Sequence, residues 1–202
     1  MAAEQQQQQE PKRRLFVALT FGREERVALG KARDELLSRV RKGTPNADGN
    51  LHLTLAFLGM CTDAEERAVT DAICAAVAQS EPIQLELGAL GVFSRRHGSV
   101  VWRSAAGSPA LMELQQRLVQ ELETRGFELD TRPFTPHITL ARNVCATEGQ
   151  NLKQTCAEIS KDLEPLRTHH ENVSLMWSHH PEGGPLTYTP VFTEALGENQ
   201  HQ

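Results

Sequence analysis

The sequence has no long apolar run. It contains no stretch of eighteen or more consecutive apolar residues, and the N-terminal MAAEQQQQQEPKRR has no apolar segment behind its charges. The first absence argues against a membrane-spanning helix and the second against a secretory signal. We therefore expect no membrane partner. We also expect a disordered polar tail over residues 1–13 and a flexible tail over residues 197–202.

Cysteine is scarce and irregularly spaced. The four cysteines, Cys61, Cys74, Cys145 and Cys156, form no C-x-x-C pair. This spacing does not suit a zinc site, and a chain of this size does not need a disulfide framework. We expect a reduced, cytoplasmic, monomeric protein that holds no metal and no cofactor.

An excess of positive charge is also missing. The 21 Lys and Arg residues are outnumbered by 26 Asp and Glu residues, which gives a formal net charge of −5. Proteins that coat nucleic acids are usually basic, so this balance argues against that class. It leaves room for a small, locally positive pocket that takes one nucleic-acid end.

The pattern of apolar residues predicts alternating strands and helices in the first half of the chain. Thr62 or Asp63 can cap one of these helices, because Glu65 and Glu66 fall in its first turn. The expected elements are a strand at 14–21, a helix at 22–40, a turn-rich segment at 42–50, a strand at 52–59, a helix at 62–79 and a strand at 84–93.

The second half repeats this order. It predicts a strand at 99–104, a helix at 109–125, a strand at 137–142, a helix at 151–161, a strand at 172–178 and a last strand at 186–196. The last two would pair across the turn PEGGP. An internal duplication explains the repeat, and it predicts one domain over 14–196 made of two α+β lobes.

Two of the expected strands carry polar residues in an otherwise buried pattern. HLTLAFLG begins with His52 and Thr54, and HITLAR begins with His137 and Thr139. Residues two apart on a strand point to the same face, so each histidine projects beside its threonine. The apolar residues between them point to the opposite face, towards a core.

Two such pairs facing each other suit phosphoryl transfer. One neutral imidazole can deprotonate a water while a protonated one donates to the leaving oxygen, and two hydroxyls can hold a phosphoryl group. No carboxylate shares the strand faces of His52 or His137, so a phosphodiesterase without a metal follows more easily than a metallohydrolase. The residues leave open which histidine is the acid.

The simpler explanation is a structural one. A single His-x-Thr on an apolar strand is more often a hydrogen-bonded, partly buried pair than a catalyst. Two copies at equivalent points of a repeated plan favour the catalytic interpretation.

Several arginines lie near the second motif in the sequence. Arg142 follows Thr139 by three positions, where it can reach a phosphate if the strand bends. Arg132 can contact RNA or orient the loop that leads into the motif. Arg95 and Arg96 can guide an RNA backbone, although a charged hairpin turn explains them equally simply.

Aromatic and paired histidine residues complete the candidates. Phe134 and Trp102 can stack a terminal base, but core packing is the commoner role of such residues. The pairs at 169–170 and 179–180 do not chelate as units, because neighbouring strand residues point apart, and we expect them at the surface.

These motifs resemble the two-histidine (2H) phosphoesterase superfamily, and more narrowly the bacterial RNA 2',3'-cyclic phosphodiesterases, also called 2'-5' RNA ligases. The resemblance covers nearly everything from Arg14 to Leu196. Its pieces are RLFVAL, NLHLTLAFLG, LGVFSRR followed by VVW, RPFTPHITLAR, and SLMWS before YTP.

The resemblance implies a bilobal α+β fold with antiparallel sheets facing a central cleft and helices outside. It implies hydrolysis of an RNA-terminal 2',3'-cyclic phosphate to a 2'-phosphate, with ligation as a secondary reversal of related chemistry. His52 would be the proton donor and His137 the proton acceptor. Thr54, Thr139 and Arg142 would bind the phosphate.

Two other functions stay open. The same acid–base set would serve an enzyme that acts on small cyclic nucleotides or 2'-5' oligonucleotides. A module that binds RNA ends without turnover would keep the same pocket, although its intact histidines and threonines argue against it.

Overall fold

The computed structural model describes residues 10–106 and 108–197, so most of both expected tails lies outside the described residues. Within this range the structure contains nine strands and four α-helices. The strands are β1 (Arg13–Thr20), β2 (Lys42–Pro45), β3 (His52–Cys61), β4 (Ile83–Phe93), β5 (Ser99–Ala106), β6 (His137–Cys145), β7 (Leu166–His170), β8 (Asn172–His179) and β9 (Thr187–Ala195). The helices are α1 (Arg23–Ser38), α2 (Asp63–Val77), α3 (Pro109–Thr124) and α4 (Leu152–Asp162).

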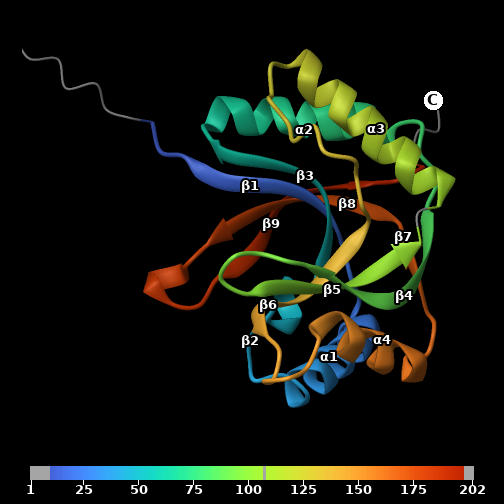
Figure 1. The fold of residues 1–202 in the computed structure, drawn as a ribbon. Helices are drawn as coiled ribbons and strands as arrows, with labels where there is room; N and C mark the ends of the chain where they lie inside the picture. The colour runs from blue at the N-terminus through green and yellow to red at the C-terminus, as the bar shows by residue number, and fades with distance from the viewer. Residues whose placement is uncertain (1–9, 107, 198–202) are drawn as a thin grey trace, which may run out of the picture.

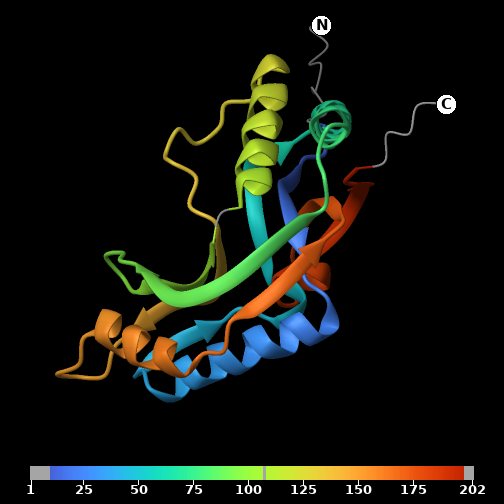
Figure 2. The ribbon, with the colours of Figure 1, turned by 90° about the vertical axis from the view of Figure 1, so that its right-hand side faces the viewer.

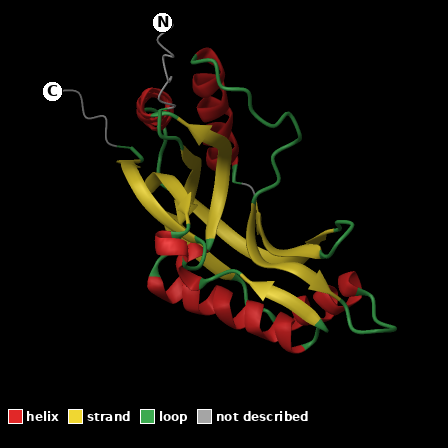
Figure 3. Ribbon diagram, turned by 90° about the vertical axis from the view of Figure 1, so that its left-hand side faces the viewer, coloured by secondary structure: helices red, strands yellow, loops and turns green. Residues whose placement is uncertain are grey.

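The strands lie between two pairs of helices (Figures 1 and 3). Their order is β7-β4-β5-β6-β3-β1-β8-β9, with β2 paired to the free stretch of β6, and every pairing is antiparallel. Helices α2 and α3 pack together over β3 and its neighbours, and α1 and α4 cover the β6 side (Figure 2). The predicted α+β fold with two lobes and external helices is confirmed.

The strand order is symmetric about the β6–β3 junction. Going outwards from it, β6-β5-β4-β7 on one side matches β3-β1-β8-β9 on the other. The lobes nevertheless do not coincide with the two halves of the sequence. Strand β4 belongs to the first half of the sequence but pairs with β5 of the second half. Strand β8 belongs to the second half but pairs with β1 of the first half. Each lobe is therefore built from both repeats.

The junction itself is a single paired position. Leu53 of β3 pairs with Ile138 of β6, and both side chains are fully buried. These are the residues between the histidine and the threonine of each motif. Burial of this pair joins the two lobes and fixes the two motifs against each other.

Local sequence explains where the helices begin. The Thr62 hydroxyl accepts from the backbone N–H of Glu65, and the Glu65 carboxylate accepts from the backbone N–H of Thr62, which forms the predicted capping box of α2. In α3 the Ser108 hydroxyl accepts from the backbone N–H of Leu111, and Pro109 stands at the first helical position. The predicted helices at 109–125 and 151–161 are confirmed to within a residue at each end.

Two expectations about local structure are wrong, and one strand was not predicted. The turn-rich segment at 42–50 contains strand β2 and a short 3-10 helix, Asp48–Asn50, because β6 offers β2 a free edge. Strand β7 was not expected, and it pairs with β4. His170, expected at the surface, is buried in β7, where its ring bonds the carbonyl of Thr20 and the hydroxyl of Thr168.

Among the described residues, no helix is both long enough and apolar enough to cross a membrane.

The junction should be sensitive to truncation. We expect Ile138→Ala to lower the free energy of unfolding by about 2–5 kcal/mol, because it leaves a cavity where the lobes meet. Urea denaturation would measure the change. Val27→Ala, at an exposed position of α1, is the matched control and should change stability by less than about 0.5 kcal/mol. An equal effect of the two substitutions would contradict the role of the junction.

Candidate active site

His52 stands at the start of β3 with its ring held at both nitrogens. Its Nδ1 lies 2.6 Å from the carbonyl oxygen of Asn50, and its Nε2 lies 2.9 Å from the hydroxyl of Thr54. A carbonyl oxygen can only accept, so Nδ1 carries the proton in the neutral ring. Nε2 then accepts from Thr54. The side chain is 7% exposed.

His137 repeats this arrangement at the start of β6. Its Nδ1 lies 2.7 Å from the carbonyl oxygen of Thr135, which fixes the same tautomer. Its Nε2 has no hydrogen-bond partner in the part of the chain that the structure describes. The lone pair on this nitrogen is therefore free to accept a proton.

The lobe junction brings the two motifs onto one face. Because Leu53 and Ile138 are paired and antiparallel, His52 is set towards Thr139, and Thr54 towards His137. The two histidines occupy diagonal positions, for which the residue separation is typically about 7–8 Å and the Cβ atoms are somewhat closer. This face lies opposite the one that packs against the helices. Two imidazoles and two hydroxyls thus share one face of the paired strands.

A β-bulge brings Arg142 onto the same face. Trp102 of β5 pairs with Thr139, and the residue before it, Val101, pairs with Ala141. Strand β6 therefore carries one extra residue at Leu140. The extra residue reverses the alternation, and Leu140 and Ala141 are both buried. Arg142 consequently shares a face with His137. Its charge acts on the pKa of both histidines.

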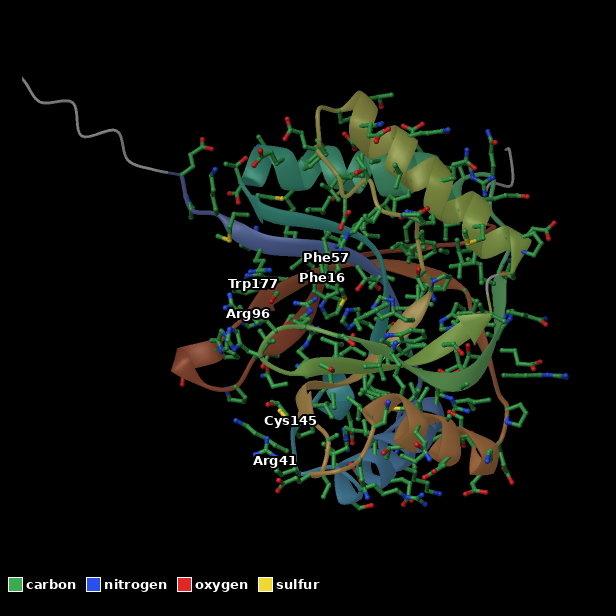
Figure 4. All side chains as sticks on the ribbon, in the orientation of Figure 1. Phe16, Arg41, Phe57, Arg96, Cys145 and Trp177 are labelled. Atoms are coloured by element: carbon green, nitrogen blue, oxygen red, sulfur yellow. The ribbon has the colours of Figure 1, made fainter. Side chains whose placement is uncertain are left out.

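Strand β3 contains the equivalent bulge, and there the returning residue is aromatic. Ala18 of β1 pairs with Thr54, and Val17 pairs with Ala56, which leaves Leu55 as the extra residue. Phe57 then takes the position that Arg142 takes in β6. Its side chain is 62% exposed, and its ring lies 6.1 Å from that of Phe16 (Figure 4).

Aromatic side chains enclose each histidine. The ring of His52 lies 4.7 Å from Phe16 and 5.1 Å from Tyr188. The ring of His137 lies 5.0 Å from Phe93 and 5.8 Å from Trp102. These rings limit the movement of the imidazoles, and they contribute to the burial of His52.

The Trp102 ring depends on a glycine beneath it. A Cβ atom on Gly91 would lie 2.2 Å from the Trp102 ring, so no larger residue fits without moving the indole. The glycine therefore lets Trp102 lie against both Phe93 and His137.

A buried asparagine links the two motifs from behind. The Asn46 amide donates to the carbonyl oxygen of Thr139 at 2.9 Å and to that of Asn50 at 3.3 Å. Asn50 is the residue whose carbonyl fixes the His52 tautomer, and its own side chain bonds the backbone of Leu186 and Tyr188. Asn46 thus ties the support of His52 to the strand of His137.

Both histidines have lowered pKa values. Burial is the largest cause for His52, and it lowers its pKa to about 4 against the opposing hydrogen bond to Asn50. Burial also lowers the pKa of His137, and the Arg142 charge adds to the effect. Both rings are therefore mainly neutral at pH 7.

The other sequence-predicted residues lie outside this group. Arg132 sits in the loop before β6, where its guanidinium is bound to Asp130. Phe134 packs against the core. Arg95 and Arg96 are exposed at the tip of the β4–β5 hairpin.

Sequence reasoning missed much of the support for the site. Phe16, Phe93, Tyr188 and Asn46 were not among its candidates. Phe16 and Phe93 lie within RLFVAL and LGVFSRR, two of the pieces that carry the resemblance, but nothing in these pieces distinguishes them from core residues. Asn50 stands two residues before His52, and that short spacing was a usable signal.

No three His, Cys, Asp or Glu side chains in the described ranges are close enough together to hold a metal ion.

Known proteins resemble this chain in both sequence and fold. RNA 2',3'-cyclic phosphodiesterase of Geobacillus stearothermophilus is 33% identical over 128 residues, which are 63% of this chain and 41% of that protein. The enzyme of that name from Thermotoga maritima is 28% identical over 130 residues, 64% of this chain and 69% of the relative. The chain thus matches less than half of the length of the first relative.

Solved structures match over a longer range. E. coli LigT complexed with 3'-AMP is 28% identical and has a TM-score of 0.72, covering 93% of this chain and 99% of LigT. TT0787 of Thermus thermophilus has a TM-score of 0.71 at 26% identity, covering 93% of this chain and all of that protein. The model of the 2'-5' RNA ligase superfamily matches residues 25–182. The chain belongs to the 2'-5' RNA ligase superfamily.

Proposed function

We propose that the chain is an RNA 2',3'-cyclic phosphodiesterase that opens a terminal 2',3'-cyclic phosphate to a 2'-phosphate. The observation that carries the proposal is the shared face of the two His-x-Thr pairs, with one free imidazole lone pair and one cation, Arg142. The names of the relatives from several species support the same reaction.

The geometry suits an in-line displacement. His137 takes a proton from water through its free Nε2, and the water oxygen attacks phosphorus. The bond from phosphorus to the 3'-oxygen breaks, and protonated His52 gives its proton to that oxygen. Thr54, Thr139 and Arg142 hold the phosphoryl oxygens during the step. The products are a 2'-phosphate and a 3'-hydroxyl.

The negative charge of the substrate explains how His52 can act as the proton donor despite its low pKa in the free protein. His52 is neutral in the free site, but a phosphate between the two imidazoles stabilises a protonated ring. Binding therefore charges the site for the reaction. The exposed ring of Phe57 beside the site offers a stacking surface for the terminal base.

The proposal also covers the substrate, the domain organisation, the oligomeric state and the cellular compartment. We propose an RNA end as the substrate, a single two-lobed domain over 14–196, and a monomer that works without a metal in the cytoplasm, where its four free cysteines stay reduced. Reverse 2'-5' ligation at the same site is secondary. Small cyclic nucleotides are the second candidate substrates, since the groups on the shared face would hold only a phosphate and one base.

A direct assay tests the reaction. Metal-stripped protein in excess chelator is incubated with an oligoribonucleotide that ends in a 2',3'-cyclic phosphate, and mass spectrometry with phosphatase mapping locates the product phosphate. We expect a 2'-phosphate. His52→Ala and His137→Ala should each lower the rate by about 10²–10⁴-fold, because each removes a proton-transfer group.

His180→Ala is the matched control, since this exposed histidine lies outside the site and should keep the wild-type rate. Loss of activity with chelator would disprove the metal-independent mechanism.

The pH dependence follows from the pKa values. The reaction needs one proton shared by the histidine pair, and both pKa values in the free protein lie below the usual 6.5. We expect kcat/KM, which reports the free protein, to peak below about pH 6.5. The kcat optimum should lie at higher pH, because bound phosphate raises both pKa values. A kcat/KM maximum above pH 7 would contradict the burial of the pair.

Asn46 should act as a positioning residue. We expect Asn46→Ala to lower kcat/KM by roughly 10–100-fold, because the supports of His52 and Thr139 are no longer tied together. Steady-state kinetics well below the unfolding temperature would measure this. Asn151→Ala removes the cap of α4, away from the site, and should cost stability without lowering kcat/KM. Wild-type kinetics of Asn46→Ala would rule out the positioning role.

A further inference from the structure

Basic side chains from two separate segments lie at one end of the sheet. The tip of the β4–β5 hairpin carries Arg95, Arg96 and His97, and the start of β2 carries Arg41 and Lys42. We call these five residues the basic edge. All five are exposed, and Figure 4 shows Arg96, Cys145 and Arg41 along the same side of the molecule.

Strand pairing places the hairpin tip and the start of β2 beside the same end of β6. Ser99, which follows the hairpin tip, pairs with Val144 of β6, and Lys42 pairs with Cys145. The backbone N–H of Arg41 also bonds the carbonyl oxygen of Cys145 at 3.1 Å. The end of β6 therefore lies between the hairpin tip and the start of β2.

The charge of this edge is not balanced nearby. Residues 41–46, 94–99 and 142–147 contain five Lys and Arg residues and no Asp or Glu. Among the ion pairs of the described residues, none involves Arg41, Lys42, Arg95 or Arg96. A solvated hairpin tip would explain two arginines. It would not explain an uncompensated patch drawn from two segments of a chain with net charge −5.

The basic edge continues from the site. Strand β6 runs from His137 through Arg142 to Cys145. Arg142 pairs with Thr44 of β2. Two steps of β2, Thr44 to Lys42, lie opposite three steps of β6, Arg142 to Cys145, so this part of β6 rises only about 7 Å. A stacked nucleic-acid strand has about 3.4 Å per phosphate, so about three phosphates span this distance.

The hairpin tip is fixed in this position by a close backbone contact. Gly98 has φ of +115°, and a Cβ atom on it would lie 2.9 Å from the Cα of Asn143. Only glycine lets the tip approach β6 so closely. The cations of the tip are thus held beside the residue that follows Arg142.

We propose that the basic edge binds the phosphates of the nucleotides on the 5' side of the reacting end. The favoured substrate is then an RNA strand of at least about four nucleotides, and a mononucleotide is a poor one. This inference rests on the proposed function. It gives the path of the strand beyond the terminal nucleotide.

Kinetics with substrates of graded length test the inference. The substrates are 2',3'-cyclic AMP and oligoribonucleotides of two, four and six residues that end in a 2',3'-cyclic phosphate. We expect kcat/KM to rise up to about four residues and then level. In Arg95→Gln/Arg96→Gln and in Arg41→Gln/Lys42→Gln, KM for the hexamer should rise by about tenfold at unchanged kcat. The kinetics of 2',3'-cyclic AMP should not change.

The salt dependence gives a second readout. Each double variant should reduce the slope of log KM against log salt for the hexamer by about 1.4, because two phosphate contacts are lost at about 0.7 each. Arg23→Gln/Arg67→Gln is the charge-matched control, with two exposed arginines on the helices α1 and α2. It should behave as wild type. Equal effects of the control and edge variants would overturn the inference, and so would an equal loss on 2',3'-cyclic AMP.

Binding separates this inference from the proposed function. Fluorescence anisotropy with a 5'-labelled hexamer is measured in a His52→Ala/His137→Ala background, with and without the edge substitutions. If the wild type hydrolyses no substrate but binding still depends on the edge, the proposed reaction fails and the strand-binding edge stands. If hydrolysis occurs and the edge substitutions alter neither binding nor KM, the edge inference is wrong and the reaction stands.

Discussion

The contact between Leu53 and Ile138 sets the geometry of the whole site. Each residue lies between the histidine and the threonine of its motif, and the pair forms the ladder position that joins β3 to β6. Because the strands are antiparallel and alternate in facing, one buried pair is enough to place four polar groups on the opposite face. The packing that stabilises the protein and the geometry of the proposed catalytic groups therefore depend on the same two side chains.

The bulges extend this face in a way that simple alternation does not. Without the extra residue at Leu140, Ala141 would face the histidines and Arg142 would point away. The matching bulge at Leu55 turns Phe57 to the equivalent place in β3. The duplicated plan thus gives one cation and one aromatic ring at related positions, which are the two group types that phosphate and base require.

Sequence patterns predicted the elements whose signals are local. The capping box at Thr62 and the period of two in HLTLAFLG are examples, and so is the position of α3 after Ser108 and Pro109. Strand β2 and the buried His170 were missed because partners distant in sequence determine them: β6 for the first, and Thr20 for the second. The need for a bend before Arg142 was foreseen. Its form was not, because a bulge is a property of two paired strands.

The electrostatics of the site follow from how little charge it holds before substrate binds. Aromatic rings and burial keep both imidazoles neutral, and the charge of Arg142 lowers their pKa values further. Each of these effects opposes a second positive charge, and the charge of Arg142 also favours an incoming negative one. In the proposed reaction, a phosphodiester anion supplies that charge. It stabilises a proton on one histidine while the other keeps its lone pair, so binding of the substrate creates the acid and base pair that the reaction uses.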